Sequence, residues 1–371
     1  MPSSLRALFR FQESGLVLVI LALGIVLTAF SGQVRTPVFK DAADGSRERV
    51  FTTNADGERV PLLVEKNKFL NAQVFAQLAK DTSFTAIMAV GMAMVIISGG
   101  IDLSVGAIYA LASVLGALVL HRFGPDGVAA GSSPWFGLFL GVCACIGVGA
   151  LCGLANGTLI VALGVHPFII TLGAMAILRG MAFVATDGQS IGRFSPELQH
   201  IVLAPIGGLS LVPFIVMVLV TAAGWIFLAR LAAGRRVYAV GGNETAARFS
   251  GIKVGRVKLG VFLFSGLTAG IAALLNIGYY GAGTSGDGQG YELNVIAAAV
   301  VGGASLTGGR GTALGAVLGA LIIQMISTGI VFLGIDQNYS QIIIGTVIIA
   351  AVVLDRFNTW LARRRLTRAT A

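Results

Sequence analysis

Long apolar runs separated by short polar segments dominate this 371-residue sequence. A helix of about 20 apolar residues is needed to cross the roughly 30 Å hydrocarbon core of a bilayer. Several runs are short or merge with a neighbour, so we expect an all-α polytopic membrane protein with about 8–10 transmembrane helices. The expected spans lie near residues 15–30, 83–98, 103–120, 135–163, 166–185, 211–230, 258–278, 292–303, 312–333 and 340–354.

The composition agrees with this pattern. Hydrophobic residues make up 56% of the chain and charged residues only 12%, whereas a soluble domain carries about 25% charged residues. The formal charge of +9 is concentrated beside apolar runs, as the positive-inside rule expects, and does not indicate a nucleic-acid partner. The three cysteines share one apolar run without a nearby histidine, so we expect neither a disulfide nor a metal site.

The basic residues also predict the orientation and organisation of the chain. Arginine and lysine dominate the stretch around residues 230–258 and the C-terminal tail, so both are expected to be cytoplasmic, together with the N-terminus. The expected segments are an N-terminal tail with the first span (1–30), a polar extracytoplasmic segment (31–68), a first transmembrane half (69–230), a cytoplasmic loop (231–257), a second transmembrane half (258–355) and a basic cytoplasmic tail (356–371).

The polar segment 31–68 is the one extended polar stretch outside the expected core. Asp56-Gly57 lies between short β-prone runs and predicts a hairpin. The following stretch, FLNAQVFAQLAK, has apolar residues on one helical face. We expect it to form an interfacial helix that leads into the second span.

An internal repeat relates the two halves. GGIDLSVGAIYALASVLGAL (99–118) aligns without gaps with GGASLTGGRGTALGAVLGAL (302–321), and about half of the aligned positions are identical. Many transporters are built from such repeats. In both copies a glycine pair is expected to end one helix before the next begins. The residues of these two expected helix breaks are Gly99, Gly100, Asp102, Ser104, Gly302, Gly303 and Ser305.

Asp102 is a carboxylate inside an apolar region, where a charge is costly. The second copy has Ser305 at the equivalent position, and both residue types are good helix N-caps. We therefore favour a structural cap for Asp102, while a direct part in substrate passage or gating stays open. Arg179 is the other costly charge within a span, and we expect it to bind a carbonyl or carboxylate or to extend to the cytoplasmic side.

Polar or aromatic residues beside expected helix breaks are candidates for lining a substrate pathway, and these are Asn156, Phe168 and Thr171. Small residues at every fourth position predict close helix packing in lipid, as at Gly149, Gly153 and Gly157. The scattered histidines have no Ser or Cys arranged as a nucleophile, which disfavours a membrane enzyme.

The cytoplasmic loop contains the stretch NETAARFSG, which predicts a short surface helix. Asn243 is a good N-cap, Glu244 is favourable at the positive helix end, and Gly251 is a good C-terminal stop. Small residues such as Ala246 and Ala247 on an exposed helix suit insertion into the groove of a partner protein.

Four motifs now define a resemblance: GGIDLSVG, the LRG of 178–180, YAVGGNETAARFSGI and VVGGASLTGGRG. In this order they resemble permease subunits of ATP-binding cassette importers for ribose and similar monosaccharides, over about residues 69–356. The resemblance implies a bacterial inner-membrane protein with a second permease copy, either identical or a close paralogue. It also implies two ATPase subunits and an extracytoplasmic sugar-binding protein as partners.

In this family the NETAARFSG region is similar to the coupling helix that contacts the ATPase. The resemblance therefore implies coupling roles for Asn243, Glu244, Ala246, Ala247 and Gly251. The chain has no G-x-x-x-x-G-K-[ST] motif, so we expect it to bind no cofactor and a partner subunit to hydrolyse ATP. The competing hypothesis is an ion-coupled secondary transporter that uses Asp102 as its ion or proton site.

Overall fold

The computed structural model describes residues 13–41, 47–53, 57–347, 349–350 and 353. The basic tails of the sequence, at 1–12 and 354–371, lie outside the described residues. The helices are α2 (Ser14–Phe30), α3 (Ala72–Ile97), α4 (Val105–Arg122), α5 (Pro134–Leu163), α6 (Pro167–Thr186), α7 (Glu197–Val202), α8 (Val212–Arg230), α9 (Ala232–Gly242), α10 (Glu244–Phe249), α11 (Val254–Tyr280), α12 (Tyr291–Val301) and α13 (Ala313–Phe332), with a 3₁₀ turn at Gln337–Tyr339.

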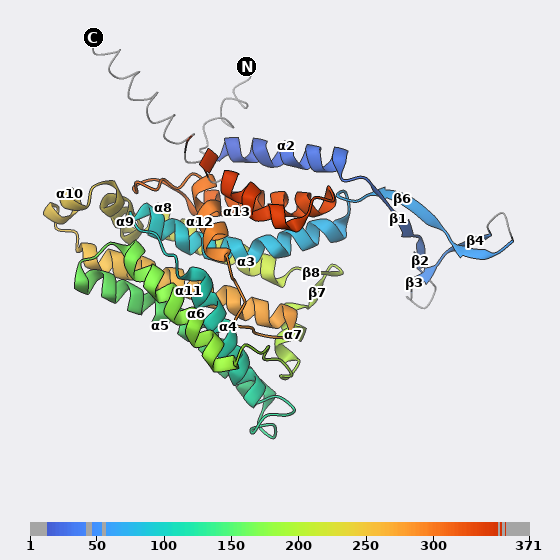
Figure 1. Cartoon of the computed structure of the whole chain (residues 1–371), viewed down its shortest axis with the longest axis horizontal. Coiled ribbons are helices and arrows are strands. Elements are labelled where there is room, and N and C mark those ends of the chain that lie inside the picture. The colour runs from blue at the N-terminus through green and yellow to red at the C-terminus, as the bar shows by residue number, and fades with distance from the viewer. Residues whose placement is uncertain (1–12, 42–46, 54–56, 348, 351–352, 354–371) are drawn as a thin grey trace, which may run out of the picture.

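The helical bundle confirms an all-α polytopic membrane protein (Figure 1). Seven described helices are long and apolar enough to cross a membrane: α3, α4, α5, α6, α8, α11 and α13. The apolar helix α2 is slightly shorter, and described residues between 340 and 353 are also helical. The expected span at 292–303 is wrong as a complete crossing, because α12 has 11 residues and reaches only about 16 Å.

The middle of the bundle is formed by α3, which is packed on all sides. In its most apolar 18-residue window 94% of the residues are buried, against 11% for α6 and 22% for both α5 and α8. A helix that is apolar all round belongs in the interior of a membrane protein or against lipid. The exposed apolar faces of α5, α6 and α8 therefore suit contact with lipid or with another membrane subunit.

Glycines bring α5 and α11 into close contact. A Cβ atom at Gly153 would lie 2.3 Å from the carbonyl oxygen of Phe262, and one at Gly149 would lie 2.3 Å from that of Gly266. Both distances are far below a van der Waals contact, so only glycine allows the two backbones to approach this closely. The small-residue pattern at 149–157 is thus confirmed as a helix-packing surface.

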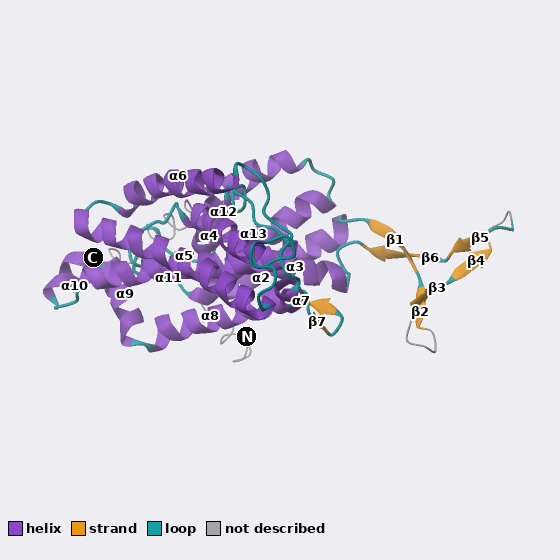
Figure 2. Cartoon of the chain, turned by 90° about the horizontal axis from the view of Figure 1, so that it is seen from below, coloured by secondary structure: helices purple, strands orange, loops and turns teal. Residues whose placement is uncertain are grey.

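The segment before α3 forms an arm of short antiparallel strands that projects from one end of the bundle (Figures 1 and 2). The strands are β1 (Gln33–Pro37), β2 (Phe39–Asp41), β3 (Arg47–Arg49), β4 (Phe51–Thr53), β5 (Arg59–Pro61) and β6 (Leu63–Asn67), with a further small hairpin of β7 (Pro205–Ile206) and β8 (Leu209–Ser210). The pairing of β4 with β5 confirms the hairpin expected around Asp56-Gly57, although residues 54–56 are outside the described residues.

The separate interfacial helix expected after this arm is wrong. Asn71 caps the first turn of α3 by accepting a hydrogen bond from the backbone N–H of Gln73. From there α3 continues without interruption to Ile97, since no glycine or proline breaks its first four turns. The amphipathic stretch is therefore the outer end of the second apolar helix.

The two copies of the repeat occupy equivalent places in the bundle. α3, a break and α4 form the first hairpin, and α12, a break and α13 form the second. The backbone N–H of Gly309, in the second break, donates to the carbonyl oxygen of Ile97 at the first break, at 2.8 Å. Both hairpins therefore turn at the same end of the bundle, opposite the arm, which indicates parallel copies (Figure 1).

Candidate functional site

Asp102 lies at the first helix break and is completely buried. Its Oδ1 accepts hydrogen bonds from the backbone N–H of Ser104 at 3.0 Å and from the Ser104 hydroxyl at 2.6 Å. Because α4 begins at Val105, the N-cap is Ser104, which makes no capping side-chain bond. The predicted cap role of Asp102 is therefore wrong, since its carboxylate orders the turn before the helix.

The same carboxylate connects helices that are distant in the sequence. Its Oδ2 accepts a hydrogen bond from the Ser265 hydroxyl of α11 at 3.0 Å. The Ser104 hydroxyl in turn accepts from the Asn156 amide of α5 at 2.8 Å. Within the described part of the chain, Asp102 forms no ion pair with a lysine, arginine or histidine. The carboxylate is thus held by hydroxyl and amide groups that join α4, α5 and α11.

The second break has a different local structure. Gly303, with φ of 92°, takes the left-handed conformation that ends a helix, whereas Gly302 stays near helical geometry. In the first break Gly99 takes this left-handed conformation, with φ of 85°, and Gly100 does not. The predicted cap at Ser305 is wrong, because α13 begins only at Ala313 and its N-cap is Thr312. The repeat therefore preserves a glycine that ends the preceding helix, and in neither copy is the predicted residue the N-cap of the following helix.

Both breaks meet the C-terminal end of α9. A Cβ at Gly241 would lie 1.7 Å from the carbonyl oxygen of Ile97, so α9 rests directly on the first break. A polar cavity of about 480 Å³ lies beside this contact. Its lining includes Gly99 and Gly100 of the first break, Thr307 of the second, and Asn243 and Glu244 at the start of α10.

The surface helix expected from NETAARFSG is confirmed as α10. Oδ1 of Asn243 accepts a hydrogen bond from the backbone N–H of Ala246 at 2.9 Å, which makes Asn243 the N-cap. Gly251 ends the helix with φ of 79°. The backbone N–H of Ile252 donates to the carbonyl of Ala247 at 3.0 Å, as in a Schellman motif.

Glu244 attaches α10 to the first turns of α11. Its carboxylate accepts from Lys258 Nζ at 2.8 Å and from Arg248 Nη2 at 3.2 Å. The hydrogen bond from Lys258 lowers the pKa of Glu244 below its usual value, and the nearby charges of Lys258 and Arg248 act in the same direction. The carboxylate is therefore a fixed anion between α10 and α11 at neutral pH.

The two alanines of α10 occupy different environments. Ala247 is buried against Val240 of α9 and Val254 of α11, so it contacts its own chain and is not an exposed coupling residue. Ala246 is exposed on the outer face. Phe249, the last residue of α10, is 88% exposed. Phe249 was not among the coupling residues predicted from the sequence, although an aromatic residue near the end of a short polar helix could have indicated a contact surface.

The remaining candidates are partly connected to the first break. Asn156 and Thr171 are buried, and the Thr171 hydroxyl lies 3.3 Å from the carbonyl oxygen of Ile101. Phe168 is 44% exposed. Arg179 donates through Nη1 to the carbonyl oxygens of Ser285 and Asp287, at 2.8 and 2.6 Å, so it fixes the 281–290 loop. The pathway roles of Asn156, Phe168 and Thr171 stay predictions.

A membrane-spanning helical bundle with repeated helix breaks and a capped surface helix at the same end has the architecture of a transporter's membrane component. The family model described as "branched-chain amino acid transport system / permease component" matches residues 74–352. The chain therefore belongs to this family of permease components. No solved structure matches it significantly.

Curated relatives cover most of the chain. The D-allose transport system permease protein AlsC of Escherichia coli K12 is 37% identical over 288 residues, which are 78% of this chain and 85% of that protein. The ribose import permease protein RbsC of Bacillus subtilis is 39% identical over 289 residues, 78% of this chain and 86% of that protein. The fructose import permease protein FrcC of Rhizobium meliloti is 34% identical over 297 residues, which are 78% of this chain and 79% of that protein.

Proposed function

We propose that this chain is the permease subunit of an ATP-driven importer for a monosaccharide or a similar small polyol. The relatives named for ribose, allose and fructose support the substrate class. The observation that carries the proposal is the position of α10. This capped surface helix is fixed to α11 by the Glu244–Lys258 ion pair and borders the cavity between the two helix breaks.

A mechanical route leads from α10 to the first break. An ATPase that moves α10 would move α11 through Glu244 and Lys258 and through the apolar contact of Ala247. Two turns further along α11, Ser265 donates to Asp102 in the break. Rigid elements joined in this way transmit displacement without large local rearrangement. The mechanism we propose is alternating access, in which this displacement opens the pathway toward the opposite membrane face.

The partners follow from the same proposal. Two ATPase subunits would bind at the α10 end and hydrolyse ATP, a sugar-binding protein would deliver substrate at the opposite end, and a second permease copy would complete the pathway. The protein would lie in the bacterial inner membrane with both termini cytoplasmic, and the loop 231–257 would be the ATPase contact. Asn243, Glu244, Ala246 and Gly251 shape this contact, and Ala247 supports it from inside.

The ion-coupled alternative has no support among the relatives. The experiment that separates the two is uptake of radiolabelled monosaccharides by right-side-out membrane vesicles, loaded with ATP or left without it and supplied with the sugar-binding protein. The proposal expects uptake that requires ATP on the cytoplasmic side and continues after ionophores have removed the proton and sodium gradients. Uptake that persists without ATP and stops with an ionophore would refute it.

A further inference from the structure

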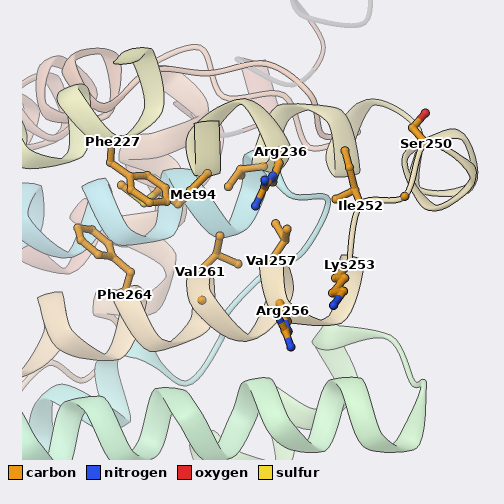
Figure 3. A pocket seen from close by; sticks show the side chains of 14 residues that line it. Met94, Phe227, Arg236, Ser250, Ile252, Lys253, Arg256, Val257, Val261 and Phe264 are labelled. Atoms are coloured by element: carbon orange, nitrogen blue, oxygen red, sulfur yellow. The ribbon is translucent and has the colours of Figure 1, made fainter. Parts of the chain in front are cut away.

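A cavity of about 640 Å³ lies between α8, α9 and α11, beside α10 (Figure 3). Its two ends differ in chemistry. Phe227, Phe264 and Met94 lie together at one end, and the two aromatic rings stack with centroids 6.4 Å apart. Toward the α10 end the wall includes the cations Arg236, Lys253 and Arg256. None of the described residues that line this cavity is acidic.

The three cations are exposed, and they differ from their neighbours because no described residue is an anionic partner for them. Arg248 and Lys258, which are close by in the sequence, both pair with Glu244. Among the described residues, no ion pair involves Arg236, Lys253 or Arg256. Three like charges around one opening repel each other, so an anion between them lowers the electrostatic energy.

The first turn of α11 adds to this positive field. The helix begins at Val254, and its N-cap residue Lys253 makes no capping side-chain bond. The backbone N–H groups of Val254 and Arg256 already donate to the carbonyl oxygens of Ile252 and Lys253, so the start of this 27-residue helix contributes mainly the partial positive charge of its dipole. The opening of the cavity therefore combines three side-chain cations with a favourable helix end.

We propose that this cavity binds an anionic phospholipid of the cytoplasmic leaflet. The phosphate would lie among Arg236, Lys253 and Arg256, and an acyl chain would extend along Val257 and Val261 toward the aromatic pair. Free phosphate would use only the charged end, whereas the apolar wall fits an acyl chain. Basic pockets between membrane helices on the cytoplasmic side are suited to acidic headgroups.

The position of the cavity gives the lipid a consequence for transport. Ser250 and Gly251, at the end of α10, belong to its wall together with α9 and α11. A bound lipid would hold these three elements at a fixed spacing. The lipid would then support the surface through which an ATPase acts on the bundle.

The test is native mass spectrometry of the full chain, extracted from its membrane in mild detergent with its co-purifying subunits. The charge variant replaces Arg236, Lys253 and Arg256 with Gln. Its control replaces three other arginines at the same end of the bundle, Arg230, Arg235 and Arg310, with Gln, which gives the same change in net charge. The quantity measured is the number of phosphatidylglycerol molecules retained per chain.

A second pair of variants tests the apolar part of the cavity. Gly260 lines the cavity and has no atom near its absent side chain, so Gly260→Phe would fill the space. Gly173 on α6 has equally open surroundings outside the cavity, so Gly173→Phe is the matched control. Because both glycines are in long helices, the two variants carry the same intrinsic change in helix propensity.

The proposal expects one tightly retained phosphatidylglycerol per native chain. The charge variant should retain at least about tenfold less, since each cation near an anionic headgroup contributes several-fold. Gly260→Phe should show a similar loss, and both controls should retain the native amount. Equal retention in variant and control would overturn the proposal. Release of the lipid by inorganic phosphate, or its absence whenever an ATPase co-purifies, would also overturn it.

Discussion

Replacement of Asp102 separates a structural carboxylate from a transporting one. The side chain is completely buried and accepts three hydrogen bonds, from the backbone and hydroxyl of Ser104 and from the hydroxyl of Ser265. Asp102→Ala removes both acceptor oxygens and so all three hydrogen bonds. Asp102→Asn keeps the oxygen that faces Ser104, and its amide group can donate to the Ser265 hydroxyl, which rotates to accept.

The magnitude follows from the number of donors left without a partner. A buried donor that loses its acceptor costs about 1–3 kcal/mol. Relaxation and water entry reduce the sum, so Asp102→Ala should destabilise the protein by roughly 3–6 kcal/mol. Asp102→Asn should cost only about 1 kcal/mol, the scale of one rearranged hydrogen bond.

The assays are thermal unfolding in detergent and sugar uptake in cells that express each variant at a matched level. We expect Asp102→Asn to transport at a rate close to native, and Asp102→Ala to unfold at a much lower temperature. If Asp102→Asn is as stable as the native protein but transports nothing, the carboxylate has a role in passage and the structural account is refuted.

Three further predictions concern α10 and the packing of the bundle. Asn243→Ala removes the capping bond to Ala246, which costs about 1 kcal/mol, so ATP-driven uptake should fall several-fold while Asn243→Ser retains it. Gly153→Leu should prevent recovery of folded protein in detergent chromatography, because its side chain would meet the backbone of α11. The pKa of Glu244 is lowered in the folded state, chiefly by Lys258, so the pair stabilises the protein above the unfolded carboxyl pKa of about 4.3. As the pH falls below this value and passes the lower pKa of the folded state, the Glu244 carboxylate becomes protonated and the stabilisation is lost. The difference in melting temperature between native protein and Glu244→Gln should therefore disappear in this pH range.

The short surface helix could be predicted from sequence in detail, because its determinants are local. An Asn cap, an acidic first turn and a terminal Gly act within a few residues of each other. The glycine contacts of α5 were also predictable, because a four-residue period places Gly149 and Gly153 on one face. The class of the fold followed from apolar runs of membrane-spanning length.

The roles within the helix breaks could not be predicted in the same way. Asp102 and Ser305 align in the repeat, yet neither caps a helix, because α4 starts at Val105 and α13 at Ala313. One partner of Asp102, Ser104, is only two residues away, but the other, Ser265, lies on α11, and a sequence pattern does not reveal which distant hydroxyl faces a carboxylate. The burial of Ala247 likewise depends on the packing of α9 against α11.

The contact between α10 and an ATPase is the central claim, and affinity purification of single variants tests it most directly. Ala246→Arg adds a large charge to the exposed face of α10 and leaves the buried Ala247 intact, while Ala130→Arg makes the same change in an exposed loop at the opposite end. We predict that mass spectrometry finds an ATP-binding cassette ATPase with the native chain and with Ala130→Arg, and not with Ala246→Arg. An active native chain that purifies without any ATPase, or an ATPase bound equally to both variants, would contradict the account.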